Sequence, residues 1–330
     1  MALAGDWGTG TDEAARIAEL IKKDNCEYTI HLGDVYYVGD EASIAGNCRG
    51  IKQPNGYDPV KWQAGTVGSF ALNGNHEAYA RDCAYFRWIQ GDDPQPHSSC
   101  FCLFNDHWCV IGLDTGYNSE GIPWLGWLAE QRGWPFLLPS CKLPDAVMDW
   151  LGTAVQPALS AERGIVLLSH HQYVSAFDNE YPNAARQLAR VAQFRNRDLL
   201  WLWGHEHRLA AYNLYSDEGI RAYGRCLGHG GMPVDRGEMP KRARPLQFYD
   251  DRSYDPVAKK VVGADTVFGV NGYAVMEFYG PGLKVTYKDI SGAMVVSESW
   301  SVSNGNVVPT GKVITGSHVK LLPDGRLVSA

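Results

Sequence analysis

The chain has 330 residues and a formal net charge of −7, with 45% hydrophobic and 20% charged residues. This composition excludes a disordered chain and predicts one large or two small globular domains, while the acidic balance disfavours a broad nucleic-acid-binding surface. No apolar run approaches the ~18 residues of a membrane span. No signal peptide is visible and the eight cysteines form no CxxC pair, so we expect reduced thiols and a cytoplasmic location.

Short apolar runs predict buried strands, and Gly, Asp, Asn or Ser follows each run at once. The runs cover residues 2–4, 28–32, 70–72, 165–168 and 199–203. Between them, apolar residues at helical spacing predict one helix capped by Thr11 and a second over 146–158. Alternating strands and helices indicate an α/β layered fold, in which ligands bind beyond the carboxyl ends of the strands.

Two further strands, 273–279 and 283–289, are predicted on either side of a Gly-Pro-Gly turn. We predict a main domain over 1–290 and a β-rich C-terminal extension over 291–330. Long connections span 40–67, 116–144 and 232–260, and their sequences contain no readable specificity code. The last one holds a basic run (Arg236, Lys241, Arg242 and Arg244), which we interpret as a solvated loop in preference to a substrate clamp.

The polar clusters at the strand ends are rich in metal-binding residue types. In chain order they read GDWG from Gly5, GDVYY from Gly33, GNHE from Gly74, SHHQ from Ser169 and GHEH from Gly204. Each cluster alone is also typical of a turn or a packed core, but the ordered set predicts one convergent site. Imidazole and carboxylate donors without cysteine suit Zn, Mn and Fe. The two oxygens of Asp34 would allow it to bridge two such ions.

This ordered set resembles the calcineurin-like metallophosphoesterase superfamily over Gly5 to His207, and the strands up to about Ile290 extend the resemblance. It implies a four-layer α/β/β/α sandwich of two mixed sheets flanked by helices. It also implies two metal ions and, at position 76, a general acid that protonates the leaving oxygen. The implied ligands are Asp6 and His207 at one ion, Asn75, His170 and His205 at the other, and Asp34 between them, with His76 as the acid.

One departure narrows the resemblance to a branch. Position 8 is Gly where most members have a ligand His, and the second motif reads GDVYY. This combination resembles the purple acid phosphatase branch, whose tyrosine supplies a phenolate to ferric iron. Tyr37 stands at that position, with simple core packing as the alternative. The resemblance therefore implies Fe at the Tyr37 site and Fe, Mn or Zn at the other. The motifs also lack the GDxVDRG pattern of protein Ser/Thr phosphatases, which disfavours a protein substrate.

The implied activity is hydrolysis of a small-molecule phosphate ester by in-line attack of a metal-bound hydroxide, with monoesters favoured. A phosphodiesterase that acts on small-molecule or nucleotide diesters is the alternative enzyme. A non-catalytic metal-binding scaffold of the same fold is the alternative outside catalysis. His171, and His229 in a glycine-rich loop after GHEH, are candidate substrate contacts. No motif indicates a protein partner.

Overall fold

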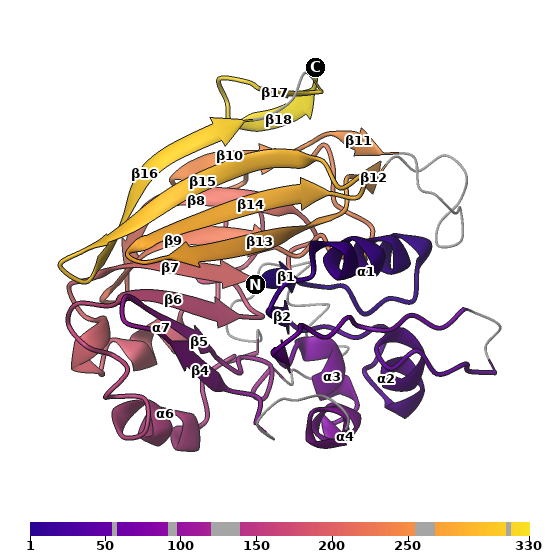
Figure 1. Ribbon diagram of the computed structural model, residues 1–330, viewed down its shortest axis with the longest axis horizontal. Helices are drawn as coiled ribbons and strands as arrows, with labels where there is room; N and C mark the ends of the chain where they lie inside the picture. The colour runs from indigo at the N-terminus through magenta and orange to yellow at the C-terminus, as the bar shows by residue number, and fades with distance from the viewer. Residues whose placement is uncertain (55–57, 92–97, 120–138, 255–267, 315–317) are drawn as a thin grey trace.

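The computed structural model describes residues 1–330 except 55–57, 92–97, 120–138, 255–267 and 315–317. Two large mixed sheets form its centre (Figure 1). The first has seven strands in the order β16-β15-β14-β13-β1-β2-β3. Their bounds are β1 Ala2–Ala4, β2 Tyr28–His31, β3 Gly68–Ala71, β13 Gly272–Tyr279, β14 Gly282–Asp289, β15 Met294–Ser303 and β16 Asn306–Ile314. Strands β1, β2 and β3 are parallel, and the pairs from β1–β13 to β15–β16 are antiparallel.

The second sheet has nine strands in the order β17-β18-β10-β8-β9-β7-β6-β5-β4. Their bounds are β4 Phe101–Phe104, β5 Trp108–Gly112, β6 Gly164–Ser169, β7 Asp198–Trp203, β8 Leu209–Asp217, β9 Ile220–Leu227, β10 Leu246–Asp250, β17 Val319–Leu321 and β18 Arg326–Ser329. Strands β5, β6, β7 and β9 are parallel. A separate two-stranded sheet pairs β11 Ser253–Tyr254 with β12 Phe268–Gly269.

Three apolar clusters define the layers. One lies between the two sheets, one joins the first sheet to α1, α2 and α4, and one joins the second sheet to α6 and α7. The helices of the described residues are α1 Asp12–Asp24, α2 Glu41–Asn47, α3 Asn75–Tyr79, α4 Cys83–Gly91, α6 Asp145–Gly152, α7 Asn183–Leu188 and the 3₁₀ helix η2 Ala192–Phe194. Along β6, Val166 and Leu168 enter the cluster between the sheets, whereas Ile165 and Leu167 enter the helix-side cluster, as strand alternation requires. The predicted α/β fold of two mixed sheets is confirmed.

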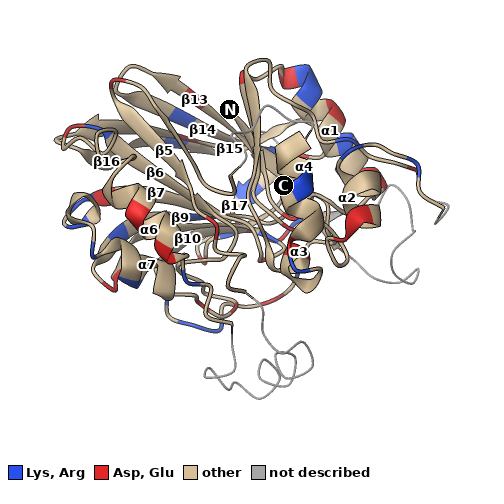
Figure 2. Cartoon of the chain, turned by 90° about the horizontal axis from the view of Figure 1, so that it is seen from below, with Lys and Arg blue, Asp and Glu red and all other residues tan. Residues whose placement is uncertain are grey.

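Helix α1 follows the sequence prediction closely. Thr11 is its N-cap, and the Thr11 hydroxyl accepts from the Ala14 amide at 3.1 Å. Acidic residues occupy its first turn and basic residues its last turn, which complements the helix dipole (Figure 2). The helix predicted over 146–158 is shorter, because α6 ends at Gly152. Pro157 lacks an amide proton and could not continue the helix.

The C-terminal residues take part in both sheets. Strands β15 and β16 extend the first sheet beyond β14, and β18 pairs with β10 in the second. The division of the chain into a main domain and an extension at residue 290 stays a prediction. Strands after residue 290 pair with strands before it. Part of the 116–144 connection, 120–138, lies outside the described residues. Among the described helices, none has the length and hydrophobicity needed to cross a bilayer.

Candidate metal centre

The predicted site residues converge because they follow strands whose carboxyl ends meet at one edge of the sandwich. They follow β1 (Asp6), β2 (Asp34), β3 (Asn75), β6 (His170) and β7 (His205 and His207). Both sheets therefore contribute to the same site. This convergence was expected from the strand-end positions of the motifs, and the roles of these residues as ligands are proposed below.

The backbone turns sharply at several of these positions. Asp6, Asp34 and His205 have positive φ angles of 55°, 73° and 67°, in the left-handed region that residues other than glycine seldom adopt. Such conformations concentrate at functional sites, where surrounding contacts hold them in place. One neighbour must also be small, since a Cβ at Gly204 would lie 2.6 Å from Oδ2 of Asp6. The Asp6 carboxylate is thus held by close backbone packing.

A first group of donor atoms surrounds the Tyr36 hydroxyl. The Tyr36 oxygen lies 2.8 Å from Oδ1 of Asp6 and 2.9 Å from Nε2 of His207. It also lies 3.1 Å from Oδ2 of Asp34. The backbone amide of His205 donates to the other Asp6 oxygen at 2.7 Å, which orients that carboxylate. Phenol, imidazole and carboxylate atoms therefore meet within hydrogen-bond distance.

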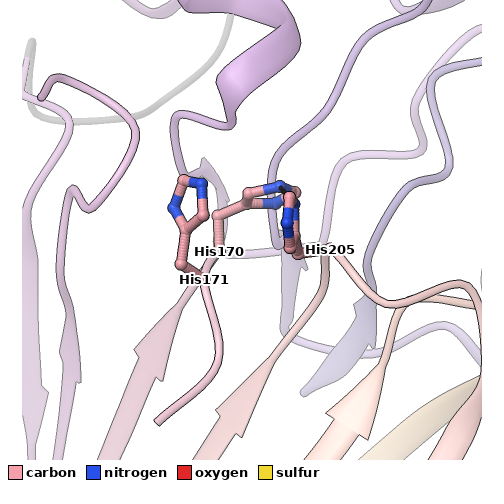
Figure 3. Close-up of side chains that lie close together, drawn as sticks. All are labelled: His170, His171 and His205. Atoms are coloured by element: carbon pink, nitrogen blue, oxygen red, sulfur yellow. Dashed lines mark hydrogen bonds between the residues drawn. The ribbon is translucent and has the colours of Figure 1, made fainter. Parts of the chain in front are cut away.

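A second group joins the ends of β6 and β7, and the rings of His170 and His205 lie side by side there (Figure 3). Oδ1 of Asn75 lies 3.1 Å from Nε2 of His170 and 2.9 Å from Nδ1 of His205. Nδ1 of His170 lies 2.9 Å from the Leu32 carbonyl oxygen, so it must donate there, and Nε2 is the nitrogen left for a metal ion. Nε2 faces the Asn75 amide oxygen and, at 3.3 Å, Oδ1 of Asp34. Two oxygen acceptors that converge on this nitrogen fit a proton on Nε2 in the metal-free chain, and a cation could replace that proton.

In the metal-free chain, the short distances between these side chains shift their pKa values. Burial raises the pKa of Asp34, but the neighbouring His170 and His76 outweigh it and hold the pKa well below its usual range. Burial opposes charging of His170, but Asp34 outweighs it and raises the pKa of that imidazole to about 9. Burial and the nearby carboxylates of Asp34 and Asp6 raise the pKa of Tyr36 well above its usual range. The Tyr36 hydroxyl is therefore protonated without a Lewis acid beside it.

The structure corrects the predicted tyrosine by one position. Tyr37 is 64% exposed, and the Tyr36 side chain enters the site in its place. Val35 forms a parallel bridge with Gly8, and the Tyr36 amide donates to the Gly8 carbonyl oxygen at 2.9 Å. The chain turns directly after this bridge, and the Tyr36 side chain enters the site while that of Tyr37 stays exposed. No local pattern in the sequence distinguished these two neighbouring tyrosines.

A cavity of about 450 Å³ opens onto these groups. Its wall includes Asp34, Asn75, His76, His205 and His207 from the predicted set. It also includes residues that we did not predict, namely Phe177, Asp178, Asn179, Tyr181, Glu206, Asp235, Lys241 and Arg242. The interpretation of the basic run as a solvated loop does not hold for Arg242, because this residue lines the cavity with Nη1 buried, whereas the Lys241 side chain is 63% exposed. No local pattern in the sequence indicated that the loop folds back over the site.

The two candidate substrate contacts, His171 and His229, are buried side chains. His171 is 2% exposed and its Nδ1 lies 3.1 Å from the Thr115 hydroxyl, although its ring is 4.7 Å from that of His205. His229 is also 2% exposed, and its carbonyl oxygen accepts from the Gly272 amide at 2.8 Å. Burial lowers the pKa of His229 to about 4. Neither residue is among the described residues that line the cavity, and substrate contact by His171 or His229 stays a prediction.

The fold and the donor groups together define a class of α/β proteins that hold metal ions at converging strand ends. A family model described as calcineurin-like phosphoesterase matches residues 1–209. The chain therefore belongs to the calcineurin-like phosphoesterase family and is a metal-dependent phosphoric ester hydrolase. Membership agrees with the described His and Asp groups, one of which joins Asp6, Asp34 and His170. No curated protein matches the sequence.

Solved structures are similar to this chain at low sequence identity. GAP50 of Plasmodium, described as the anchor in the inner membrane complex, is 13% identical, with a TM-score of 0.59 over 92% of this chain and 88% of that chain. A dimetal phosphatase from Danio rerio is 10% identical, with a TM-score of 0.43 over 93% of this chain and 97% of that chain. A predicted phosphoesterase from Streptococcus pneumoniae is 11% identical, with a TM-score of 0.31 over 94% and 95%. The GAP50 similarity shows the fold alone.

Proposed function

We propose that the chain hydrolyses small-molecule phosphate monoesters at a centre that holds two metal ions. The ligands of the first ion are Asp6, Tyr36 and His207, those of the second are Asn75, His170 and His205, and Asp34 is shared. Fe is proposed at the Tyr36 side, with Fe, Mn or Zn at the other. These assignments combine the family resemblance with the distances described above.

The position of Asp34 is the observation that carries this proposal. Its Oδ2 lies 3.1 Å from the Tyr36 hydroxyl, in the first donor group. Its Oδ1 lies 3.3 Å from Nε2 of His170, in the second. One carboxylate thus contributes an oxygen to each group. A carboxylate placed between two sets of donors is suited to bridging two ions.

When bound, the two ions supply the Lewis acidity that neutralises phosphoryl oxygens and makes water a stronger nucleophile near neutral pH. Attack by water on phosphorus, in line with the leaving oxygen, requires no covalent intermediate on the chain. The described residues that line the cavity fit this route, because they include no Ser, Thr or Cys. The cavity would position the ester and exclude competing water.

His76 is the proposed general acid. Its Nδ1 lies 2.5 Å from the Tyr37 carbonyl oxygen, so Nδ1 is the donor in that contact. Its Nε2 lies 3.8 Å from Oδ2 of Asp34, on a residue that lines the cavity. When the ring carries a second proton, that proton is on Nε2, which is therefore the nitrogen that would donate to the leaving oxygen. The backbone amide of His76 also donates to Oδ1 of Asp34 at 3.1 Å, which ties the acid to the shared carboxylate.

Metal quantification paired with a two-substrate assay tests the proposal. We expect about two metal ions per purified chain, and faster hydrolysis of 4-nitrophenyl phosphate than of its bis(4-nitrophenyl) diester. Asp34→Asn should reduce the metal content to below one ion per chain and abolish measurable turnover. Asp145→Asn, in the exposed first turn of α6, is the matched control and should leave both values unchanged.

Other results would separate the alternatives. Faster hydrolysis of the diester would replace the monoesterase by a phosphodiesterase. A chain with less than one metal ion after growth with supplementary Fe, Mn and Zn, and with no activity on either ester, would favour the scaffold. A cytoplasmic location stays part of the proposal. It is consistent with the eight cysteines, which are free thiols in the structure.

A further inference from the structure

The loop over residues 232–242 forms part of the wall of the cavity that contains Asp34 and His76. The amides of Lys241 and Arg242 both donate to the Ala176 carbonyl oxygen, at 2.7 and 3.0 Å. Farther back in the loop, the amide of Asp235 donates to the carbonyl oxygen of His207 at 2.9 Å. The loop is thus hydrogen-bonded directly to a residue of the donor groups.

Arg208 contacts the same loop through two of its acidic residues. It is 4% exposed, its guanidinium donates to Oε2 of Glu238 at 2.7 Å, and it lies 3.5 Å from Oδ2 of Asp235. The guanidinium also lies 4.1 Å from the centre of the Phe177 ring. A buried arginine with two acidic partners on one loop holds that loop in a defined position. Lys241 and Arg242 are therefore presented to the cavity on a supported segment.

Arg242 differs from Lys241 and Arg244 in forming no ion pair among the described residues. Arg244 forms two hydrogen bonds with Glu180, at 2.6 and 2.7 Å, and Nζ of Lys241 lies 3.5 Å from Oε1 of Glu238. The side chain of Arg242 donates from Nη2 to Oδ1 of Asn179 at 3.2 Å. Its Nη1 is buried without a hydrogen-bond partner. A guanidinium has five N–H donors, and a buried donor left unpaired is costly.

The cavity has space for more than a phosphate group. Its volume of about 450 Å³ is in the range of sites that bind small organic molecules. Phe177 and Tyr181 add aromatic surface to the wall. The acidic residues Asp178, Glu206 and Asp235 also line it. Arg208 lies 3.7 Å from Oε2 of Glu206 and 3.5 Å from Oδ2 of Asp235. Arg242 is thus the guanidinium on the wall that has donors to spare.

We propose that Arg242, assisted by Lys241, binds a second anionic group on the leaving-group part of the phosphate ester. This inference rests on the proposed phosphoesterase function and assigns its substrate class. Arg242 is hydrogen-bonded to Ala176 and to Asn179 of the cavity wall, whereas the transferred phosphoryl group would lie at the donor groups around Asp34. Arg242 is therefore assigned to the rest of the ester. The chemistry that fits is an oxyanion with two oxygens in one plane, which a guanidinium binds through two parallel hydrogen bonds. A carboxylate and a second phosphate both meet this requirement.

Calorimetric binding to the metal-containing full chain tests the inference without turnover. The probes are phenylphosphonate, 4-carboxyphenylphosphonate and 1,4-phenylenediphosphonate, which differ only in the second group. We expect at least one of the latter two to bind about 10- to 100-fold tighter than phenylphosphonate. The carboxylate and phosphonate arms show which anion is preferred. Arg242→Gln should reduce this ratio of affinities to less than about twofold, and Arg242→Lys should restore only part of it.

Arg244→Gln is the matched control, because Arg244 lies in the same loop region, is paired with Glu180 and does not line the cavity. It should retain the full preference. Equal binding of all three probes by the wild-type chain, or a preference that survives in Arg242→Gln, would overturn the inference.

Hydrolysis separates this inference from the proposed function. The substrates are phenyl phosphate and 4-carboxyphenyl phosphate, and the expected preference is a lower KM for the second. Hydrolysis of both without that preference, together with equal binding of the phosphonates, would leave the esterase standing and refute the role of Arg242. A binding preference in a chain that hydrolyses neither ester would refute the esterase and retain the anion site. Absence of binding by all three phosphonates would count against both.

Discussion

The hydroxyl of Tyr36 lies 2.8 Å from Oδ1 of Asp6, across 30 positions of sequence. The same oxygen lies 2.9 Å from Nε2 of His207, on the second sheet. Tyr36 therefore joins donors from three segments at the place where a metal ligand is proposed. Tyr37, the next residue, is 64% exposed and contributes its carbonyl oxygen to His76. The two tyrosines give a direct test of which phenol serves the metal.

Tyr36→Phe should weaken iron binding at least about tenfold, because it removes a ligand and leaves Asp6 and His207 without their shared partner. If the phenolate binds ferric iron, the variant should also lose the visible charge-transfer absorption of the purified chain. Iron content and the visible spectrum measure both effects. Tyr37→Phe is the control and should match the wild type. A variant at position 37 that loses the absorption while Tyr36→Phe keeps it would restore the assignment made from sequence.

His76→Ala should lower kcat by about 10²- to 10⁴-fold while the metal content stays near that of the wild type. The loss should be largest for alkyl phosphates, whose leaving oxygen needs a proton, and smallest for 4-nitrophenyl phosphate, whose leaving group departs unprotonated. Steady-state kinetics over a series of leaving groups measures this dependence. A loss that is equal for every leaving group would assign His76 to substrate positioning instead of proton transfer.

Asp114 is expected to make stability fall as the pH rises. It is 1% exposed, and burial raises the pKa of its carboxyl from 3.8 to about 6. Between these values the folded chain keeps a proton that the unfolded chain has lost, so the free energy of unfolding decreases with increasing pH. Asp114→Asn removes this titration while the side-chain oxygen can still accept from the Tyr117 amide. The stability of the variant relative to the wild type should therefore rise by about 2 kcal/mol from about pH 4.5 to about pH 7.5.

Urea unfolding of the metal-free chain at the two pH values provides this comparison. The metal-free chain is used so that proton competition at the metal ligands does not contribute. A difference between variant and wild type that stays constant with pH would show that Asp114 has an ordinary pKa in the folded chain.

A buried ion pair is expected to hold the two sheets together. Arg225 on β9 and Glu298 on β15 form two hydrogen bonds, at 2.7 and 2.8 Å, and the Tyr287 hydroxyl donates to Glu298 at 2.7 Å. Arg225 and Glu298 are 1% and 2% exposed. Glu298→Ala would leave the guanidinium buried without its carboxylate, so we expect a loss of about 3–5 kcal/mol in the free energy of unfolding.

The double variant Arg225→Met/Glu298→Leu should lose less than Glu298→Ala, because neither charge remains buried. Glu19→Ala breaks the exposed Arg16–Glu19 pair, whose atoms are 2.9 Å apart, and should cost less than about 1 kcal/mol. Chemical denaturation of the three variants compares them. A double variant less stable than Glu298→Ala would mean that the pair itself adds net stability.

Much of the fold was predictable because its signals are local. Apolar runs followed by polar clusters located the strands that lead to Asp6, Asp34 and His170, and Thr11 marked the start of α1. The end of α6 was placed too late, since the apolar spacing continues beyond Gly152 while the backbone does not. The strands of residues 294–314 were expected, but their addition to the first sheet beyond β14 was not. Strand order depends on pairing between distant segments, which a local pattern does not record.

The sequence by itself determined the chemical inventory of the site, because the residue types and their order at strand ends depend only on local pattern and composition. The tertiary structure alone decided that Tyr36 faces Asp6 and that Arg242 lines the cavity. Both depend on contacts between distant segments. The bond from the Tyr36 amide to the Gly8 carbonyl oxygen holds Tyr36 beside the first motif, and the bond from Arg208 to Glu238 holds the loop over the site. Whether Tyr36 or Tyr37 enters the site, and whether a loop folds back over it, leaves every motif unchanged. Both nevertheless decide which side chains are in contact.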